Sequence, residues 1–521
     1  MMDSDRFIMI GKLNQNSMWD YFSIRILILI VCVLPVTVRS QTNEPFSDSL
    51  NNSVKLSLDE LKSDIEAGLN YLKDTQQKET IGFGYYEGEW PIYICLKRPL
   101  RLKGRSKFYD SNSFGVIPIH NCLAEIFLLY PEYRSILPML EKSMSHILTF
   151  MTDSSETFGF WRSSPPGKTL SGKMLDNNSF IKRPNHFPLR TRFTNNFVNV
   201  TDDSDDQALA LNSIYYYKKV MEKVGFGDQT YYVPDSIQYI FEKYRDVERK
   251  NILIYNLKQG YGYNTGAFLT WFGKEYEFNR TAGFSYYLNN IFWYLPISRL
   301  RSEGYEPHIP FATNDIDVVV NANILTTLAH FNLLDSTKGV EEAMELIIRK
   351  VKEGNFRKSS LYYPNRYQLH YAVSRIYSAS NRSIIDLPIT EIINDIKATQ
   401  HADGSWSGLR KSNSAEVNQS TVNALLALLN FGSYEEYNTL ENIDKAIFFL
   451  HSHAIQQNGS IHWEGGVFFC GGMYIRNLVA WKSDCNTTAL IIEAFAKYRL
   501  ILERNNVNCW VESEIIPTTN K

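Results

Sequence analysis

The sequence predicts an all-α fold in which six helical hairpins close into a ring, an (α/α)6 toroid. A weak internal repeat indicates this fold, and each unit has an amphipathic helix, a loop with glycine and an aromatic residue, and a more apolar helix. The loop ends also carry helix stop and start signals, with glycine after one helix and Ser, Asp or Asn before the next. The second helices are apolar on most faces, which predicts that they form the inner wall.

The first unit begins at Ser57, and Glu60 three residues later completes a capping box. Its second helix is expected over residues 116–129. The outer and inner helices of the remaining units are expected at 131–151 and from 205, at 236–247 and 317–333, at 339–352 and 365–377, at 389–400 and 417–429, and at 440–456 and 485–498.

Polar side chains are expected to gather at one mouth of this ring. Because the hairpins follow one another head to tail, all inner helices run in the same direction and begin at the same end. Unpaired N–H groups at helix starts carry partial positive charge, which favours polar chemistry there. The candidate residues of this mouth are Asp203, Asp205, Asp206, Asp315, Asp317, Asn321, His370 and Asp484.

Asp203, Asp205 and Asp206 are the candidate catalytic residues. Carboxylates this close together cannot all ionise, so at least one is expected to keep its proton. A neutral carboxylic acid in a dry pocket can protonate an alkene, and aromatic faces can stabilise the resulting cation. The alternative is structural: Ser204 caps a helix and the aspartates complement its dipole.

The start of the third inner helix is a second candidate wall of the mouth. Asp317 and Asn321 share one helix face, and Asp315 precedes them. Capping and polar packing between inner helices are the favoured explanation of these residues. The alternative is the second acidic wall, with bound calcium as a further option because calcium prefers carboxylate and amide oxygens. No other cofactor or metal is expected. His370 is either a structural group or a hydrogen-bond partner of Asp205.

The N-terminus indicates the secretory pathway. Residues 26–38 form a short apolar run, and Val38 and Ser40 fit a cleavage site before Gln41. We therefore expect a signal peptide or signal anchor over 1–40, a linker over 41–56, the toroid over 57–504 and a tail over 505–521, in a secreted or lumenal protein. The expected glycosylation sites are Asn51, Asn177, Asn199, Asn279 and Asn381.

Two sequons at the mouth, Asn418 and Asn486, are expected to be unused. Sequence proximity suggests the disulfides Cys95–Cys122 and Cys470–Cys485.

Composition limits the partners. The net charge is −2 and no basic block occurs, so nucleic acid is not an expected partner. The 32 Tyr, 30 Phe and 9 Trp form either a large aromatic core or an aromatic-lined cavity. A small hydrophobic or carbohydrate ligand is expected, and peripheral contact with a membrane is a further option.

The loop from Gln400 to Trp406, with Gly404 between them, resembles the Gln-x(3)-Gly-x-Trp repeat of squalene and oxidosqualene cyclases. Residues 457–463 are a degenerate copy, and residues 159–161 and 88–90 retain only the Gly-x-Trp end. This resemblance implies the ring fold of terpenoid cyclases and protein prenyltransferases. The prenyltransferase zinc ligands have no counterpart in this sequence.

Residues 203–208 resemble the Asp-x-Asp-Asp-Thr-Ala motif of class II terpenoid cyclases, with Gln207 in place of the threonine. The match implies that Asp205 protonates an alkene or epoxide. The favoured function is therefore acid-initiated isoprenoid cyclisation or isomerisation. The alternatives are a carbohydrate-active lyase or hydrolase on the same ring, and a non-catalytic secreted binding protein.

Overall fold

The computed structural model describes most of the chain between residues 55 and 514. The ranges that it describes are 55–82, 84–97, 106–152, 156–164, 181–188, 198–226, 237–249, 264–273, 307, 309, 314–380, 387–409, 412–472 and 478–514. The expected signal segment 1–40 and the sequons Asn51, Asn177, Asn279 and Asn381 lie outside these ranges.

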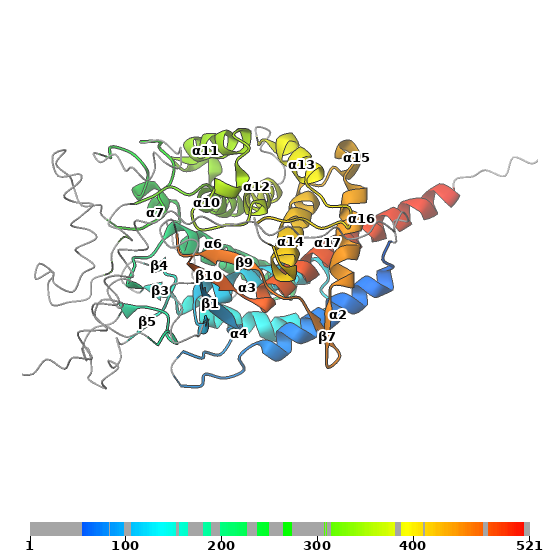
Figure 1. Ribbon diagram of the computed structural model, residues 1–521, viewed down its shortest axis with the longest axis horizontal. Helices are drawn as coiled ribbons and strands as arrows, with labels where there is room; N and C mark the ends of the chain where they lie inside the picture. The colour runs from blue at the N-terminus through cyan, green and yellow to red at the C-terminus, as the bar shows by residue number, and fades with distance from the viewer. Residues whose placement is uncertain are drawn as a thin grey trace, which may run out of the picture.

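Six helices contact one another in a closed cycle, which confirms the toroid (Figure 1). They are the helices that the sequence assigns to the inner wall. In order around the ring they are α3 (Ile117–Leu129), α6 (Ser204–Lys223), α10 (Val318–His330), α12 (Tyr367–Ala379), α14 (Ser414–Phe431) and α17 (Asp484–Glu514), which returns to α3. Because α17 runs to Glu514, the expected boundary between toroid and tail at residue 504 falls inside a helix.

Further helices cover the ring from outside. They are α2 (Leu58–Thr75) against α17, α4 (Ile136–Leu148) against α3, α11 (Val340–Lys352) against α10, and α13 (Ile389–Ala398) and α16 (Leu440–Ser452) against α14. The short α7 (Ile237–Lys243) packs its Phe241 onto Phe268. The third unit is described only in part, so the count of six hairpins stays a prediction.

The hydrophobic pattern explains which helix lies inside. Outer helix α11 buries Ala343, Leu346, Ile347 and Val351, which recur at three- and four-residue spacing along one face. Inner helix α10 instead has buried residues on every face. Each fully buried Leu or Ile stabilises the fold by about 1.5–3 kcal/mol relative to an exposed one, so this pattern selects one arrangement.

A four-stranded antiparallel sheet joins the first and last units of the ring, and the all-α prediction lacks it. Its strand order is β2 (Lys107–Asp110), β1 (Ile92–Leu96), β10 (Val479–Lys482) and β9 (Val467–Cys470). Residues 92–96 alternate between buried and half-buried positions, which is the strand period. Short hairpins are β3 (Met151–Thr152) with β4 (Thr157–Phe158), β5 (Ser163–Ser164) with β6 (Ile181–Lys182), and β7 (Ile455–Gln457) with β8 (Ser460–His462).

The repeat tryptophans close the ends of outer helices. The indole N–H of Trp406 donates to the Ile396 carbonyl near the end of α13 at 2.8 Å. In the same way Trp90 donates to Leu72 O at 2.8 Å and Trp463 donates to Leu450 O at 2.7 Å. Each of these carbonyls also accepts a backbone N–H at the end of its helix, so the indole adds a second donor and ties the loop to the outer helix.

The repeat glutamine joins its own loop to the next outer helix. Gln400 Nε2 donates to Gly404 O at 3.0 Å and to Asn442 O on α16 at 2.8 Å. Gln76 makes the equivalent bonds to Gly88 O and to Met139 O on α4, at 3.1 and 3.0 Å. The first unit therefore has the same contacts as the repeat loop, although in sequence only its Gly-x-Trp end keeps the spacing of the motif.

The Gly-x-Trp end expected at residues 159–161 does not occupy the position that the repeat loop has in other units. In two other units the backbone N–H of the tryptophan donates to a threonine of the inner helix: Trp406 N to Thr421 Oγ1 at 3.0 Å and Trp463 N to Thr488 Oγ1 at 3.2 Å. In the second unit Phe158 N donates to Gln207 Oε1 at 2.9 Å. Phe158 thus takes the tryptophan position, and Gln207 anchors the loop as threonine does elsewhere.

Neither expected disulfide is formed. Cys95 lies on β1, whereas Cys122 is buried on α3. Cys470 donates to Leu361 O at 3.5 Å, and Cys485 to Thr75 Oγ1 at 3.4 Å. These thiols therefore serve as packing groups.

Asn199 does not fit the expectation of a glycan. Its side chain is 1% exposed and accepts a hydrogen bond from Lys182 N at 2.9 Å. Asn418 and Asn486 are buried as well, in agreement with unused sequons. Within the described ranges, no helix combines the length and apolarity needed to cross a bilayer.

Candidate acid site at the mouth of the ring

Side-chain hydrogen bonds tie together the N-terminal ends of the inner helices. This confirms the geometric prediction that these ends meet at one mouth. The bonds join Ser113 in the turn before α3 to Asp206 on α6, Asp205 on α6 to Asn323 on α10, Asn365 before α12 to Ser420 on α14, and Gln419 on α14 to Thr487 on α17.

Asp203 starts helix α6 as its N-cap residue. Its Oδ1 accepts hydrogen bonds from the backbone N–H groups of Asp205 and Asp206, at 2.9 and 2.8 Å. Ser204 does not cap the helix; its hydroxyl donates to Leu269 O at 2.6 Å. The capping role expected of Ser204 in the structural alternative therefore belongs to Asp203, which places the other two aspartates in the first turn.

Asp205 is a buried carboxyl group with a donor on each oxygen. Asn323 Nδ2 donates to Oδ1 and the Tyr363 hydroxyl donates to Oδ2, both at 2.5 Å. Only 4% of the residue is exposed. Burial, and next the charge of Asp203, raise the pKa of Asp205 to about 7, although both hydrogen bonds oppose the rise.

The pKa values of the two flanking aspartates are also raised, which favours their neutral forms. Burial raises the pKa of Asp203 to about 6, while the backbone donors that it caps hold it down. Burial and the adjacent Asp203 raise the pKa of Asp206 well above its ordinary value, and Ser113 donates to its carboxyl. The cluster therefore holds protons at a pH where isolated aspartates are ionised.

The expected second wall lies beside this cluster. Asp317 is the N-cap of α10 and also accepts from Ser360 Oγ and Leu361 N, at 2.7 and 2.5 Å. Its charge is close enough to raise the pKa of Asp205. Asp315 accepts from the Tyr362 hydroxyl at 2.6 Å, and burial raises its pKa to about 6.

Asn321 is a loop anchor. Its Oδ1 accepts a hydrogen bond from Phe268 N and its Nδ2 donates to Phe268 O, both at 3.0 Å. The side chain therefore fixes the loop of the third unit. Asn323, two residues further on, is the side chain that reaches Asp205.

Two expected mouth residues do not belong to the acid cluster. His370 faces the outer helix α13, where its Nε2 lies 2.9 Å from Asp395 Oδ2. Burial lowers its pKa, and it makes no hydrogen bond to Asp205. Asp484 begins α17 and accepts from Gly465 N at 2.7 Å.

An aromatic cluster covers Asp205, and sequence reasoning did not find its members from the sheet. The Tyr363 ring packs on Phe114 and on Phe469 from β9, with ring centroids 6.3 and 5.8 Å apart. Phe469 also contacts Phe160 at 5.4 Å and Trp481 from β10 at 5.2 Å. Phe114, Phe160, Tyr363 and Trp481 are buried and Phe469 is half-buried, so the Tyr363 side of Asp205 is rich in aromatic side chains.

Metal binding has no geometric support in the part of the chain that the structure describes. No group of three or more His, Cys, Asp or Glu side chains there could hold a metal ion. The oxygens of Asp317, expected as calcium ligands, accept hydrogen bonds from protein groups instead.

No protein-family profile and no curated protein matches the sequence. Solved structures do match it at low identity. A variant of the type II terpene cyclase MstE from Scytonema, in complex with its substrate geranylgeranyl dihydroxybenzoate, is 11% identical, with 85% of this chain and 98% of that chain covered and a TM-score of 0.47. A cellobiose 2-epimerase from Bacillus thermoamylovorans is 10% identical over 85% and 99% of the two chains, with a TM-score of 0.46.

A possible member of the GH105 family from Klebsiella pneumoniae is 11% identical. The match covers 90% of this chain and 100% of that chain, with a TM-score of 0.32. The ligands and activities named for these proteins belong to them. The chain itself is an α/α toroid by the contacts of its own helices, with a buried acid cluster at its mouth.

Proposed function

We propose that the protein catalyses acid-initiated isomerisation or cyclisation of an isoprenoid, with Asp205 as the proton donor. One observation carries the proposal: Asp205 is a buried carboxyl group with a pKa raised to about 7, and it is bonded to Tyr363, whose ring packs on Phe114 and Phe469. A general acid works best when its pKa lies near the operating pH and water is excluded.

The step needs no co-reactant. The Asp205 proton adds to one carbon of a substrate C=C bond, whose π electrons form the new C–H bond and leave a cation on the other carbon. A second C=C bond attacks this cation to close a ring, or loss of a neighbouring proton forms a shifted alkene. The last proton lost restores the acid, so atoms and electrons balance.

The groups around Asp205 can stabilise both charges of the step, the negative charge on its carboxylate and the positive charge on the substrate. The Asn323 amide and the Tyr363 hydroxyl already point at the two oxygens of Asp205, so they stabilise the carboxylate that remains. The N-terminus of α6 adds favourable dipole charge. The faces of Phe114, Phe469 and Trp481 can stabilise a carbocation.

The Phe469 ring contacts both Phe114 and Tyr363, whose hydroxyl bonds Asp205, so we propose that a substrate reaches the acid from the side of these rings. Both belong to the mouth, at β9 and at the turn before α3. We also propose a secreted or lumenal location, with peripheral access to membrane-dissolved substrate. Glycosidase treatment of protein from a secretory host tests this through a mobility shift from Asn51, Asn177, Asn279 and Asn381.

The proposal is tested by incubating the full-length protein with squalene, oxidosqualene, geranylgeraniol and farnesol, with products identified by mass spectrometry. Asp205→Asn keeps the shape of the side chain and is expected to lower turnover by about 100-fold or more. Asp315→Asn is the matched control, because it alters another buried acid of the mouth that is bonded to Tyr362. Absence of any product, or equal products from wild type and Asp205→Asn, contradicts the proposal and favours a non-catalytic scaffold.

A further inference from the structure

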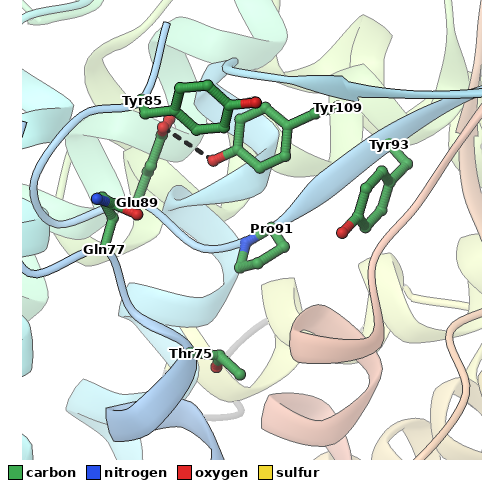
Figure 2. Close-up of a pocket in the computed structure, with 7 residues that line it drawn as sticks. All are labelled: Thr75, Gln77, Tyr85, Glu89, Pro91, Tyr93 and Tyr109. Carbon is green, nitrogen blue, oxygen red and sulfur yellow. Dashed lines mark hydrogen bonds between the residues drawn. The ribbon is translucent and has the colours of Figure 1, made fainter. Parts of the chain in front are cut away.

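A cavity of about 360 Å³ lies at the loop of the first unit, apart from the mouth aspartates. Figure 2 shows the residues that line it: Thr75, Gln77, Tyr85, Glu89, Pro91, Tyr93 and Tyr109. Its volume falls within the range of small-molecule sites, about 300–1,000 Å³.

The cavity and the aromatic cluster lie on opposite faces of the sheet formed by β1 and β2. Successive strand side chains point to opposite faces. Tyr109 lines the cavity, while its neighbour Asp110 accepts the indole N–H groups of Trp161 and Trp481 within the cluster. Tyr93 is the register partner of Tyr109, so both tyrosines belong to the same face of the sheet.

Tyrosines form the walls of the cavity. The rings of Tyr93 and Tyr109 meet edge to face with centroids 5.9 Å apart, and Tyr85 tilts against Tyr109 at 4.8 Å. The His186 ring also packs on Tyr85 with centroids 4.2 Å apart, but 39% of Tyr85 is exposed, so the uncovered part of its ring is available to a ligand at the rim. The Lys107 ammonium already lies over the Tyr93 ring, 3.9 Å from its centroid.

Polar groups converge on the same space. Glu89 is 1% exposed, and its Oε1 accepts from the Tyr109 hydroxyl at 2.9 Å and from Tyr86 N at 2.7 Å (Figure 2). Burial raises the pKa of Glu89 to about 7, and its Oε2 lies 3.6 Å from His146 Nε2, so Glu89 acts on the cavity mainly through the Tyr109 hydroxyl that it holds. Gln77 and the Tyr93 hydroxyl add further donors and acceptors.

We infer that this cavity binds a neutral carbohydrate, one sugar ring or a short oligosaccharide. A sugar presents a C–H face that packs on an aromatic ring and a rim of hydroxyls that need paired donors and acceptors. The exposed Tyr85 ring supplies the platform, and Glu89, Gln77 and Tyr93 supply the polar partners. A resident cation over Tyr93 makes a cationic ligand the weaker fit.

The site is one of recognition rather than hydrolysis. Glycoside hydrolysis generally uses two carboxyl groups that flank the scissile bond. Glu89 is the single carboxyl residue among the seven that line the cavity. The inference is independent of the isoprenoid chemistry proposed for Asp205.

Titration calorimetry and saturation-transfer NMR on the full-length protein test the inference with methyl β-glucoside, methyl α-mannoside, N-acetylglucosamine, cellobiose and choline. At least one sugar is expected to bind with a dissociation constant of about 1 mM or tighter. Tyr85→Ala is expected to weaken that binding by about tenfold or more, through loss of the platform. Tyr93→Phe is expected to weaken it about fivefold, through loss of one hydrogen bond.

Tyr239→Ala is the matched control, because Tyr239 is 70% exposed on α7 and does not line the cavity. It should bind sugar as the wild type does, and so should Asp205→Asn, which separates this inference from the cyclase proposal. Binding of choline in preference to every sugar overturns the inference, as does no sugar binding at all. Wild-type affinity in both Tyr85→Ala and Tyr93→Phe places the sugar elsewhere and also overturns it.

Discussion

Replacing Gly404 by alanine tests how the repeat loop packs on the next outer helix. Gly404 has φ +89°, and a methyl group there would overlap the backbone carbonyl of Lys445 on α16. A backbone group cannot move aside as a flexible side chain can. Gly459→Ala is a matched control, because Gly459 has a similar φ of +79° but nothing within 4 Å of an added methyl group.

The two variants share the cost of left-handed backbone, about 1–2 kcal/mol for a residue with a Cβ. Gly404→Ala adds an overpacking cost of about 1–3 kcal/mol and strains the Gln400 bond to Asn442. We therefore expect a loss of about 2–5 kcal/mol of unfolding free energy for Gly404→Ala and about 1–2 kcal/mol for Gly459→Ala.

Urea unfolding followed by circular dichroism measures this difference, with the slope of each transition checked before free energies are compared. Gly88→Ala should behave like Gly404→Ala, because its methyl group would overlap the Lys142 carbonyl on α4. Equal destabilisation by Gly404→Ala and Gly459→Ala would refute the packing argument. A neutral Gly88→Ala would refute the claim that the first-unit loop packs on its outer helix as the Gly404 loop does.

Two further predictions concern buried charge. Folding keeps Asp205 protonated up to about pH 7, whereas the unfolded chain releases this proton near pH 3.8, so unfolding free energy should fall as pH rises between these values, by at most about 4 kcal/mol from this group. Asp205→Asn cannot ionise and should flatten that slope in urea titrations at pH 4.5 and pH 8; an unchanged slope contradicts the assignment. Lys497→Met should lose about 3–5 kcal/mol of unfolding free energy, because it strips the partner from Glu125 and Glu493, which lie 2.7 and 2.6 Å from its ammonium. Thermal denaturation against Lys497→Arg checks this, and equal stability of the two variants would contradict it.

The ring could be predicted because its information is local. The capping box of Ser57 and Glu60 forms as expected, with Glu60 N donating to Ser57 Oγ at 3.2 Å. Helical spacing also separates inner from outer helices without reference to distant contacts. The meeting of Asp205 and Asp317 then follows from the head-to-tail order of the hairpins.

The sheet could not be predicted because its partners are far apart in sequence. Ile94 on β1 pairs with Trp481 on β10, and no turn signal connects them. The aromatic cluster depends on the same pairing, since Phe469 and Trp481 reach the mouth from these strands. Residues 92–96 do carry a strand period, which is the signal that sequence reasoning passed over.

Two errors have local physical causes. In the second unit Glu156, with φ +53°, takes the position that glycine holds elsewhere, two residues before the loop residue that bonds the inner helix. Gly159 therefore suggested a repeat position that Glu156 holds in the structure. His370 lies on a helix that is buried on several faces, so periodicity could not tell whether it faces the mouth or α13.

The most direct test of the central claim is the protonation of Asp205 itself. Isotope-edited infrared spectra of protein labelled at aspartate carboxyl groups, compared between wild type and Asp205→Asn, isolate this one group. A carboxyl that loses its proton near pH 7 agrees with a buried acid held neutral beneath the aromatic cluster. A group that ionises near pH 4, as aspartates in water do, contradicts the account.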